Sequence, residues 1–211
     1  MPSAPSARDH WDAVYAARTE TALTWFEAEP HLSLSLITAH ARPGDPILDV
    51  GGGASRLVDA LLAAGLGPVT VLDLSDDALA VSRRRLGARA AEVTWIVGDV
   101  TATALPGPFA VWHDRAAFHF LTEPAARAAY AAALRAALRP GGIAILSTFA
   151  DDGPETCSNL PVRRYAPEDL AAEFERHAPG LLAPVAAHRH VHTTPKGAGQ
   201  RFQTSVFRRT G

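Results

Sequence analysis

The sequence predicts an α/β fold with a mostly parallel sheet and an antiparallel hairpin at its C-terminal end. Strand-like apolar segments alternate with helix-like segments through most of the 211 residues, which indicates right-handed βαβ units whose sheet is covered on both faces. The last two strand-like segments have no helix between them, so we expect them to pair antiparallel at a sheet edge. Hydrophobic residues make up 47% of the chain, enough for the core of one domain.

The predicted strands are short apolar runs bounded by glycine, proline or acidic residues. The five expected to be parallel span residues 46–50, 69–72, 93–97, 109–112 and 143–149, and the hairpin strands span about 182–192 and 200–208. Helical periodicity and end signals predict helices over residues 54–64, 76–86, 123–138 and 167–176. Ser75 precedes the second of these helices, and its hydroxyl is suited to cap it.

We expect one domain over residues 8–211, preceded by a flexible tail over residues 1–7 that is rich in Pro, Ser and Ala. Residues 8–41 have the loose periodicity of two helices divided by Glu29-Pro30, and we interpret them as a helical lid. The polar connection over residues 150–166 is long for a passive loop, so we expect it to carry function.

Composition excludes several classes of protein. Twenty basic and twenty-two acidic residues give a net charge of −2, so no broad cationic face is available for nucleic acid. The single cysteine, Cys157, excludes an intramolecular disulfide and favours a reducing compartment. We find no apolar run suited to a signal peptide or a membrane span, and therefore expect a cytoplasmic protein without a membrane partner. The oligomeric state stays open.

The most informative segment is Asp49-Val50-Gly51-Gly52-Gly53, a glycine loop between a strand and a helix. Glycines there allow a sharp turn and a close ligand, and the following helix points its positive end at that ligand. Dinucleotides and S-adenosylmethionine both bind such loops. Arg56 stands where a dinucleotide fingerprint needs its third glycine, and Asp49 would repel a pyrophosphate but suits the ammonium group of S-adenosylmethionine. S-adenosylmethionine is therefore favoured over NAD.

Four segments together resemble the class I, or Rossmann-like, S-adenosylmethionine-dependent methyltransferases. The glycine loop resembles their D-x-G-x-G motif, Asp73 their ribose-binding acid, Gly98-Asp99-Val100 their adenine-binding position, and Arg139-Pro140-Gly141-Gly142 the turn before their fifth strand. The resemblance implies a three-layer sandwich with a seven-stranded sheet and S-adenosylhomocysteine as the product. The cofactor contacts that it implies are Asp49, Gly51, Gly52, Gly53, Asp73, Leu74, Asp99, Val100 and Asp114. Trp25, an aromatic residue of the lid, is also expected to contact the cofactor, over its methionine end.

The methyl acceptor should lie outside the carboxyl ends of the fourth and fifth strands, under the helical lid. The resemblance places Asp114, just after the fourth strand, beside the transferable methyl group. His119 is a candidate general base, with packing on the sheet as its alternative. Arg115 is expected to pair either with Asp114 or with a substrate carboxylate.

Further candidates for substrate contacts lie in the lid and in the long loop. Trp11 and Tyr15 are aromatic residues of the lid, like Trp25, although each could simply pack on the sheet. Arg164 and Tyr165 offer a charged donor and a phenol, with anchoring of the loop as the alternative for Tyr165. Three histidines at 188, 190 and 192 share one strand face, but without a nearby acid or cysteine we predict a solvated edge and no metal.

The predicted activity is transfer of a methyl group to a small-molecule nucleophile, a thiol, an amine or a hydroxyl. The aromatic lid and Asp114 also resemble compact protein-lysine methyltransferases, which gives the alternative acceptor, a protein lysine. A catalytically silent S-adenosylmethionine-binding subunit and a nicotinamide dehydrogenase are the remaining interpretations.

Overall fold

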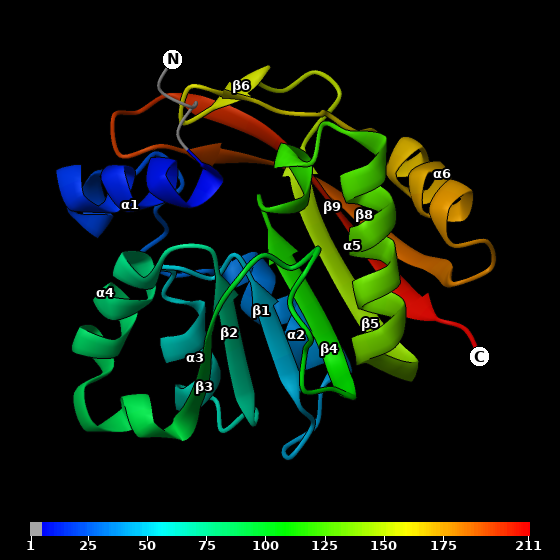
Figure 1. Cartoon of the computed structure of the whole chain (residues 1–211), viewed down its shortest axis with the longest axis horizontal. Coiled ribbons are helices and arrows are strands. Elements are labelled where there is room, and N and C mark those ends of the chain that lie inside the picture. Colours follow the sequence, from blue (N-terminus) through cyan, green and yellow to red (C-terminus); the bar gives the residue numbers. More distant parts are fainter. Residues whose placement is uncertain (1–5) are drawn as a thin grey trace.

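The computed structural model describes residues 6–211, built around a seven-stranded sheet. The strand order is β3-β2-β1-β4-β5-β9-β8, with β9 antiparallel to β5 and β8 antiparallel to β9. The other neighbours are parallel, which confirms the predicted α/β fold and its C-terminal hairpin (Figure 1). The strands are β1 (Ile47–Val50), β2 (Val69–Asp73), β3 (Val93–Val97), β4 (Phe109–Arg115), β5 (Leu138–Phe149), β8 (Leu182–Thr193) and β9 (Gly199–Arg209).

Helices cover both faces of this sheet, which makes three layers. Apolar residues of α2 (His31–His40), α3 (Leu57–Ala63) and α4 (Asp76–Leu86) form one core with one face of the sheet. Those of α5 (Pro124–Ala137) and α6 (Pro167–His177) form a second core with the other face. Ser75 caps α4 as predicted, because its hydroxyl oxygen accepts from the backbone N–H of Ala78 at 3.1 Å.

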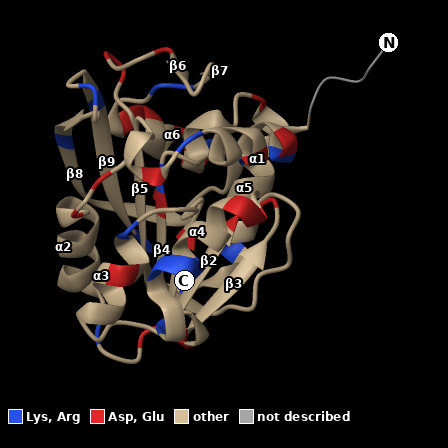
Figure 2. Ribbon diagram, turned by 90° about the vertical axis from the view of Figure 1, so that its left-hand side faces the viewer, with Lys and Arg blue, Asp and Glu red and all other residues tan. Residues whose placement is uncertain are grey.

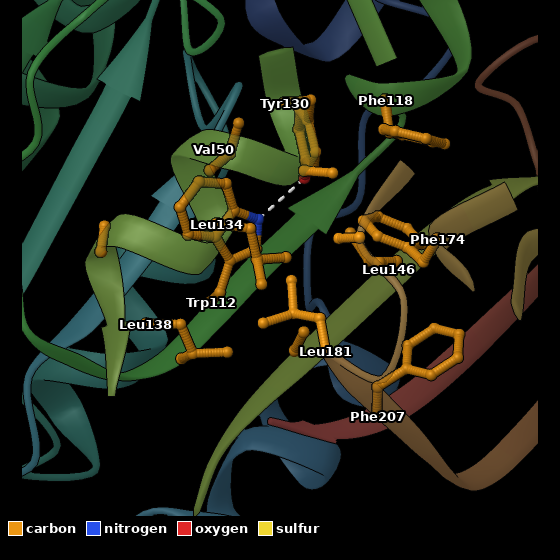
Figure 3. Close-up of a cluster of buried hydrophobic side chains, with 14 of the residues drawn as sticks. Val50, Trp112, Phe118, Tyr130, Leu134, Leu138, Leu146, Phe174, Leu181 and Phe207 are labelled. Carbon is orange, nitrogen blue, oxygen red and sulfur yellow. Dashed lines mark hydrogen bonds between the residues drawn. The ribbon is translucent and has the colours of Figure 1, made fainter. Parts of the chain in front are cut away.

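The second core surrounds Trp112 on β4. Its indole is fully buried and donates a 2.8 Å hydrogen bond to the Tyr130 hydroxyl on α5 (Figure 3). The ring of Phe118 packs edge-on against Tyr130, with 4.8 Å between centroids. A buried indole needs a partner for its N–H, so this bond ties α5 to the centre of the sheet.

The first helix, α1 (Ala7–Ala17), begins earlier than predicted. Ser6 and Asp9 form a capping box, in which each side chain accepts from the backbone N–H of the other. Residues 6 and 7 therefore belong to the fold and not to the predicted tail, whose residues 1–5 lie outside the described part. Asp12 of α1 accepts a 2.5 Å hydrogen bond from the Ser75 hydroxyl, so α1 lies beside the start of α4.

Three short elements complete the lid and the long loop. The lid contains α1, the short 3-10 helix η1 (Glu20–Ala22) and α2, as expected for helices divided near Glu29-Pro30. The long loop contains a small hairpin of β6 (Thr156–Cys157) and β7 (Leu160–Pro161). Figure 1 shows α1 and β6 near the same end of the sheet, the end where the parallel strands finish.

The departure from the predicted elements that matters most for the site is the length of β4, which continues to Arg115 instead of ending at residue 112. Side chains alternate between the two faces of a strand. Trp112 and Asp114 consequently face α5, where both bond to Tyr130. His113 faces the opposite side and bonds to Ser33 of α2.

Departures also occur at other element ends, and the longest is at β5, which begins at Leu138 instead of residue 143. The helix predicted from residue 54 begins at Leu57, after a turn. The helix predicted to reach residue 138 ends at Ala137, because Leu138 has extended backbone and pairs with Phe109. The 3-10 helices η2 (Gly87–Glu92) and η3 (Phe118–Phe120) were not predicted.

The three histidines of β8 differ in exposure, so the predicted solvated edge is wrong for part of them. His188 is exposed, but His190 stacks on Phe202 at 5.5 Å and His192 is only 5% exposed. The segment before α2 covers the end of β8 and supplies the carbonyl oxygen of Thr24, 2.8 Å from His192 Nε2. Within residues 6–211, no group of three or more His, Cys, Asp or Glu side chains is placed to hold a metal ion.

Charged residues of both signs are interspersed along the ribbon in Figure 2, in keeping with the net charge of −2. No helix in the described range has the length and apolar character needed to cross a membrane.

Candidate cofactor and acceptor site

The principal cavity, of about 360 Å³, lies at the carboxyl ends of the parallel strands. Its walls come from α1, the glycine loop, the ends of β2 to β4 and the β6–β7 hairpin. In an open α/β sheet this edge, where the chain order reverses between β1 and β4, is the expected ligand site. Nine predicted site residues line it: Trp11, Tyr15, Trp25, Gly51, Asp73, Leu74, Asp99, Val100 and Arg115.

A smaller chamber, of about 50 Å³, adjoins this cavity behind the glycine loop. It contains Asp49 and Gly52, and it shares four lining residues with the principal cavity: Tyr15, Trp25, Gly51 and Arg115. The two spaces are therefore neighbours around one loop. Asp49 is accessible from the chamber side of that loop.

The glycine loop fits against its surroundings only because it lacks side chains. Gly51 has a φ of +68°, and a Cβ there would lie 2.7 Å from the Cβ of Ala117. A Cβ on Gly52 would lie 2.6 Å from Asp49 Oδ2, and one on Gly53 would lie 2.9 Å from Asp73 Oδ2. The loop thus brings backbone close to two carboxylates at the cavity edge, which suits a ligand with hydroxyl and ammonium donors.

Asp73, the last residue of β2, presents a buried carboxylate to the principal cavity. Its side chain accepts a 2.9 Å hydrogen bond from the N–H of Ser75. Burial raises its pKa to about 7, although the N–H groups of Ser75 and Gly53 favour the ionised form. The cap of α4 is Ser75 and not Asp73, so the Asp73 carboxylate keeps acceptor capacity for a bound ligand.

Asp49 belongs to a buried network that sequence reasoning missed. Its Oδ1 lies 2.7 Å from His113 Nδ1, and His113 Nε2 lies 2.9 Å from Ser33 Oγ. Because a carboxylate accepts, the tautomer that fits this geometry donates from His113 Nδ1 to Asp49 and accepts a hydrogen bond from the Ser33 hydroxyl at Nε2. Asp49 and His113 are directly opposite in the register of β1 and β4, the signal that could have joined them.

Asp114 occupies a different environment from the one predicted. Its carboxylate accepts from the N–H groups of Ala117 and Phe118 at 2.9 and 3.1 Å and from the Tyr130 hydroxyl at 2.7 Å. It is 0% exposed and lines neither of the two cavities just described. The longer β4 turns it toward α5, so we assign it a structural role instead of contact with the methyl group.

His119 also lies behind the cavity wall. Its ring packs against Phe120 and Phe149, with centroids 4.5 and 4.9 Å away, and is 0% exposed. Burial, together with the charge of Arg115, lowers its pKa to about 3. A general base must reach the proton that it removes, so this geometry supports the packing alternative.

The two residues proposed from the long loop line neither cavity. Arg164 donates to the carbonyl of Gly153 at 3.0 Å and pairs with Glu155 at 3.2 Å, within its own loop. Tyr165 is 1% exposed and its ring lies 5.7 Å from that of Phe118. Both arrangements support anchoring of the loop.

Arg115 does line the cavity, but its partners come from the lid. It donates to the carbonyl of Trp25 at 3.0 Å and to Glu27 at 2.9 Å, with its guanidinium over the Phe202 ring at 5.3 Å. Neither partner predicted for it, Asp114 or a substrate carboxylate, is needed to satisfy these donors. His192 Nδ1 lies 3.4 Å from Glu27, so the lid segment is held at several points.

Aromatic residues from three segments form one side of the principal cavity. Trp11 of α1 packs edge-on against Trp25 and Phe120, with centroids 5.7 and 5.1 Å apart. Tyr15 lies 6.2 Å from Trp25. Phe120 and Cys157, which also line the cavity, were not among the predicted site residues.

Comparisons with known proteins agree with this geometry. Residues 47–142 match the family model described as a methyltransferase domain. A ubiquinone/menaquinone biosynthesis C-methyltransferase UbiE of Methylobacterium nodulans is 41% identical over 101 residues, covering 46% of this chain and 38% of that protein. An eEF1A lysine and N-terminal methyltransferase of Danio rerio is 26% identical over 111 residues, covering 52% and 16%. The chain thus spans well under half the length of these curated relatives.

Solved structures share the fold over nearly the whole chain. One described as "Conversion of a Disulfide Bond into a Thioacetal Group during Echinomycin Biosynthesis" has a TM-score of 0.76 and 24% identity, covering 96% of this chain and 93% of its own. The Burkholderia thailandensis 1,6-didemethyltoxoflavin-N1-methyltransferase, solved with S-adenosylhomocysteine, has a TM-score of 0.70 and 24% identity, covering 100% and 94%. Residues 47–142 are thus similar to a methyltransferase domain, and nearly the whole chain has the Rossmann-like fold of methyltransferases solved with S-adenosylhomocysteine.

Proposed function

We propose that this protein is an S-adenosylmethionine-dependent methyltransferase that acts on a small-molecule nucleophile, a thiol, an amine or a hydroxyl. The observation that carries the proposal is the continuity of the principal cavity. It joins the carboxylates at the ends of β2 and β3 to an aromatic compartment closed by α1 and the β6–β7 hairpin. A small molecule fits a covered compartment of this kind more readily than a folded protein surface does.

On the cofactor side, each proposed role follows from a group that the cavity exposes. When bound, S-adenosylmethionine supplies a methyl group on a sulfonium. We assign Asp73 to the ribose hydroxyls, because its carboxylate faces the cavity with capacity to accept. Asp99, Leu74 and Val100 surround the expected adenine position, and Asp49 faces the ammonium group from the small chamber.

On the acceptor side, the chain contributes position and exclusion of water. Trp11 and Trp25 cover the cavity, and the Arg115 hydrogen bond to the Trp25 carbonyl holds that cover in place. A displacement at a methyl carbon gains rate when the two reactants are aligned and water is kept out. Tyr15 is assigned to the same cover, between the principal cavity and the small chamber.

The competing acceptor is a protein lysine, favoured by the partial match to the eEF1A methyltransferase of Danio rerio. A catalytically silent cofactor-binding subunit is less well supported. A filled acceptor compartment would favour that interpretation, whereas the cavity here has a volume of about 360 Å³. A cytoplasmic location stays part of this proposal and rests on the single cysteine.

The test incubates the protein with methyl-labelled S-adenosylmethionine and two fractions of a cell extract, one of small metabolites and one of proteins. Label in a small metabolite supports the proposal, and label in protein lysines supports the alternative. Gly52→Val is the matched control, because its side chain would collide with Asp49 and Val71 in the loop. Cofactor binding without transfer to either fraction would contradict enzymatic activity.

A further inference from the structure

The principal cavity contains few groups that could take a proton from an acceptor. Among its 21 described lining residues, the titratable side chains are Tyr15, Asp73, Asp99, Arg115 and Cys157. A protein base must lie within reach of the acceptor and must be able to bind a proton at working pH. Each of these five can be tested against both requirements.

The two acids lie on the cofactor side of the cavity. Asp73 ends β2 and Asp99 follows β3, whereas the β6–β7 hairpin follows β5. In the sheet order, β2 and β3 lie on one side of β1, and β4 and β5 lie on the other. Asp99 is also engaged with Thr101, from which its Oδ1 accepts two hydrogen bonds. Neither acid is placed in the aromatic compartment.

The remaining three groups are not available as bases. Arg115 is a cation that pairs with Glu27 at 2.9 Å. Burial raises the pKa of the Cys157 thiol to about 12, so the thiol stays protonated at neutral pH. Burial likewise raises the pKa of the Tyr15 phenol above its ordinary value.

The titratable groups behind the walls do not line the principal cavity, and these include His10, whose ring packs edge-on against Trp11 with 5.2 Å between centroids. His119 is buried between aromatic rings and lines neither cavity. Glu27 opens only to the small chamber, where burial opposes its charge but His192 and Arg115 hold its pKa below the usual value. His190 and His192 pack against Phe202 and line neither cavity.

The compartment on the β5 side is apolar and aromatic. Trp11 and Phe120 form one wall, with rings 5.1 Å apart, and Leu121, Leu160 and Pro161 complete it. Flat apolar molecules bury well against such surfaces. A protonated amine would lose its hydration there without gaining a carboxylate from these walls.

We infer that the methyl acceptor is a flat, aromatic small molecule whose nucleophilic atom is already unprotonated near neutral pH, such as an aromatic thiolate or a heteroaromatic ring nitrogen. The inference rests on the proposed function and narrows its substrate class. The acceptor lone pair forms the new bond to the methyl carbon while the carbon–sulfur bond breaks and its electron pair stays on sulfur. A thiolate yields a neutral thioether and a ring nitrogen yields a cation, and no proton passes to the protein.

The test compares matched acceptors with the full chain at saturating S-adenosylmethionine, which removes the ionisation of Asp73 from the rate. Thiophenol and phenol share a ring but differ in ionisation, and isoquinoline and benzylamine make the same contrast for nitrogen. At neutral pH we expect thiophenol and isoquinoline to be methylated at least about tenfold faster than their partners. Equal rates within both pairs, or no methylation of thiophenol and isoquinoline, would overturn the inference.

The pH dependence of the methylation rate, measured from about pH 6 to about pH 9, is the second readout. We expect the rising limb to follow the ionisation of the acceptor and to move when thiophenol is replaced by the less acidic benzyl mercaptan. A rising limb at the same pH for every acceptor would report the ionisation of a protein base, and this result would overturn the inference. In that case methyl transfer itself would still support the proposed function, which fails only if no metabolite is labelled.

Discussion

Asp73 and Asp114 are two buried carboxylates near the ends of parallel strands, and they do different things. Burial raises the pKa of both groups, to about 7 for Asp73 and to about 6 for Asp114. The Asp73 side chain accepts from the N–H of Ser75 and borders the principal cavity. Asp114 has its two oxygens occupied by two backbone N–H groups and the Tyr130 hydroxyl.

The contrast shows that burial and a shifted pKa do not by themselves identify a ligand-binding acid. What distinguishes the two residues is whether protein donors already use the carboxylate. Asp114 connects β4, the turn at residues 117–118 and α5, so its hydrogen bonds hold the fold. Asp73 has acceptor capacity left at a cavity edge, so it can bind a ligand.

The largest expected effect is on stability, at Asp114. Asp114→Ala should lower the free energy of unfolding by about 3–5 kcal/mol, because buried donors on three residues lose their acceptor. Urea unfolding measures this, with the exposed Asp152→Ala as the control that should leave the midpoint unchanged. A variant that stays as stable as wild type while its turnover falls would restore the catalytic role first predicted for Asp114.

The next effect is on cofactor affinity, at Asp73. Asp73→Ala should weaken binding of S-adenosylhomocysteine by about 1.5–3 kcal/mol, because the ribose hydroxyls lose a charged acceptor. Calorimetric titration measures the loss, and thermal unfolding without ligand should show no matching decrease in stability. Unchanged affinity together with a lower melting temperature would mean that Asp73 only supports the turn to Ser75.

The ionisation of Asp73 should also make the affinity for S-adenosylhomocysteine and the stability of the folded protein change with pH in opposite directions. The ionised carboxylate accepts the ribose hydroxyls, so S-adenosylhomocysteine affinity should fall by up to about tenfold per pH unit below about pH 7. Its folded-state pKa exceeds that of the unfolded chain, so its contribution to stability is present at low pH and is lost as pH rises from about 4 to about 7.

The control for this pH dependence is Asp73→Asn, which cannot ionise and should lose the slope in affinity. Stability should still decrease somewhat with rising pH in that variant, because Asp114 is shifted in the same direction. An affinity slope that persists in Asp73→Asn would assign the ionisation to another group.

The smallest expected effect concerns the Asp49–His113–Ser33 network. Ser33→Ala removes one hydrogen-bond donor to a buried imidazole and should cost about 1 kcal/mol of stability. Ser35→Ala on the same helix is the matched control, since Ser35 is exposed and bonds only to the Leu32 carbonyl. Equal changes in the two variants would mean that the Ser33–His113 bond contributes nothing measurable.

Sequence reasoning succeeded where the signal is local. The glycine loop, the end of β2 at Asp73 and the helix capped by Ser75 depend on neighbouring residues, and the alternation of segments predicts the sheet. The antiparallel pairing of β8 and β9 follows from the missing helix between them.

The acceptor side could not be predicted in the same way, because it depends on long-range contacts and on one strand length. The strand β4 includes residues 113–115, which were expected to follow it, so Asp114 lies within the strand and bonds to Tyr130 of α5. Contacts such as Arg115 with Glu27 and His192 with Thr24 join segments that are distant along the chain. Only the register of Asp49 opposite His113 could have been anticipated, by aligning the two strands.

The glycine loop and the Asp73 side of the cavity form the proposed binding site for S-adenosylmethionine. Calorimetric titration of the wild-type chain with S-adenosylhomocysteine and, separately, with NAD is the decisive measurement for this site. We expect saturable binding of S-adenosylhomocysteine and no heat of binding for NAD, because Arg56 replaces the third fingerprint glycine and Asp49 disfavours a pyrophosphate. Binding of NAD without binding of S-adenosylhomocysteine would contradict this proposal.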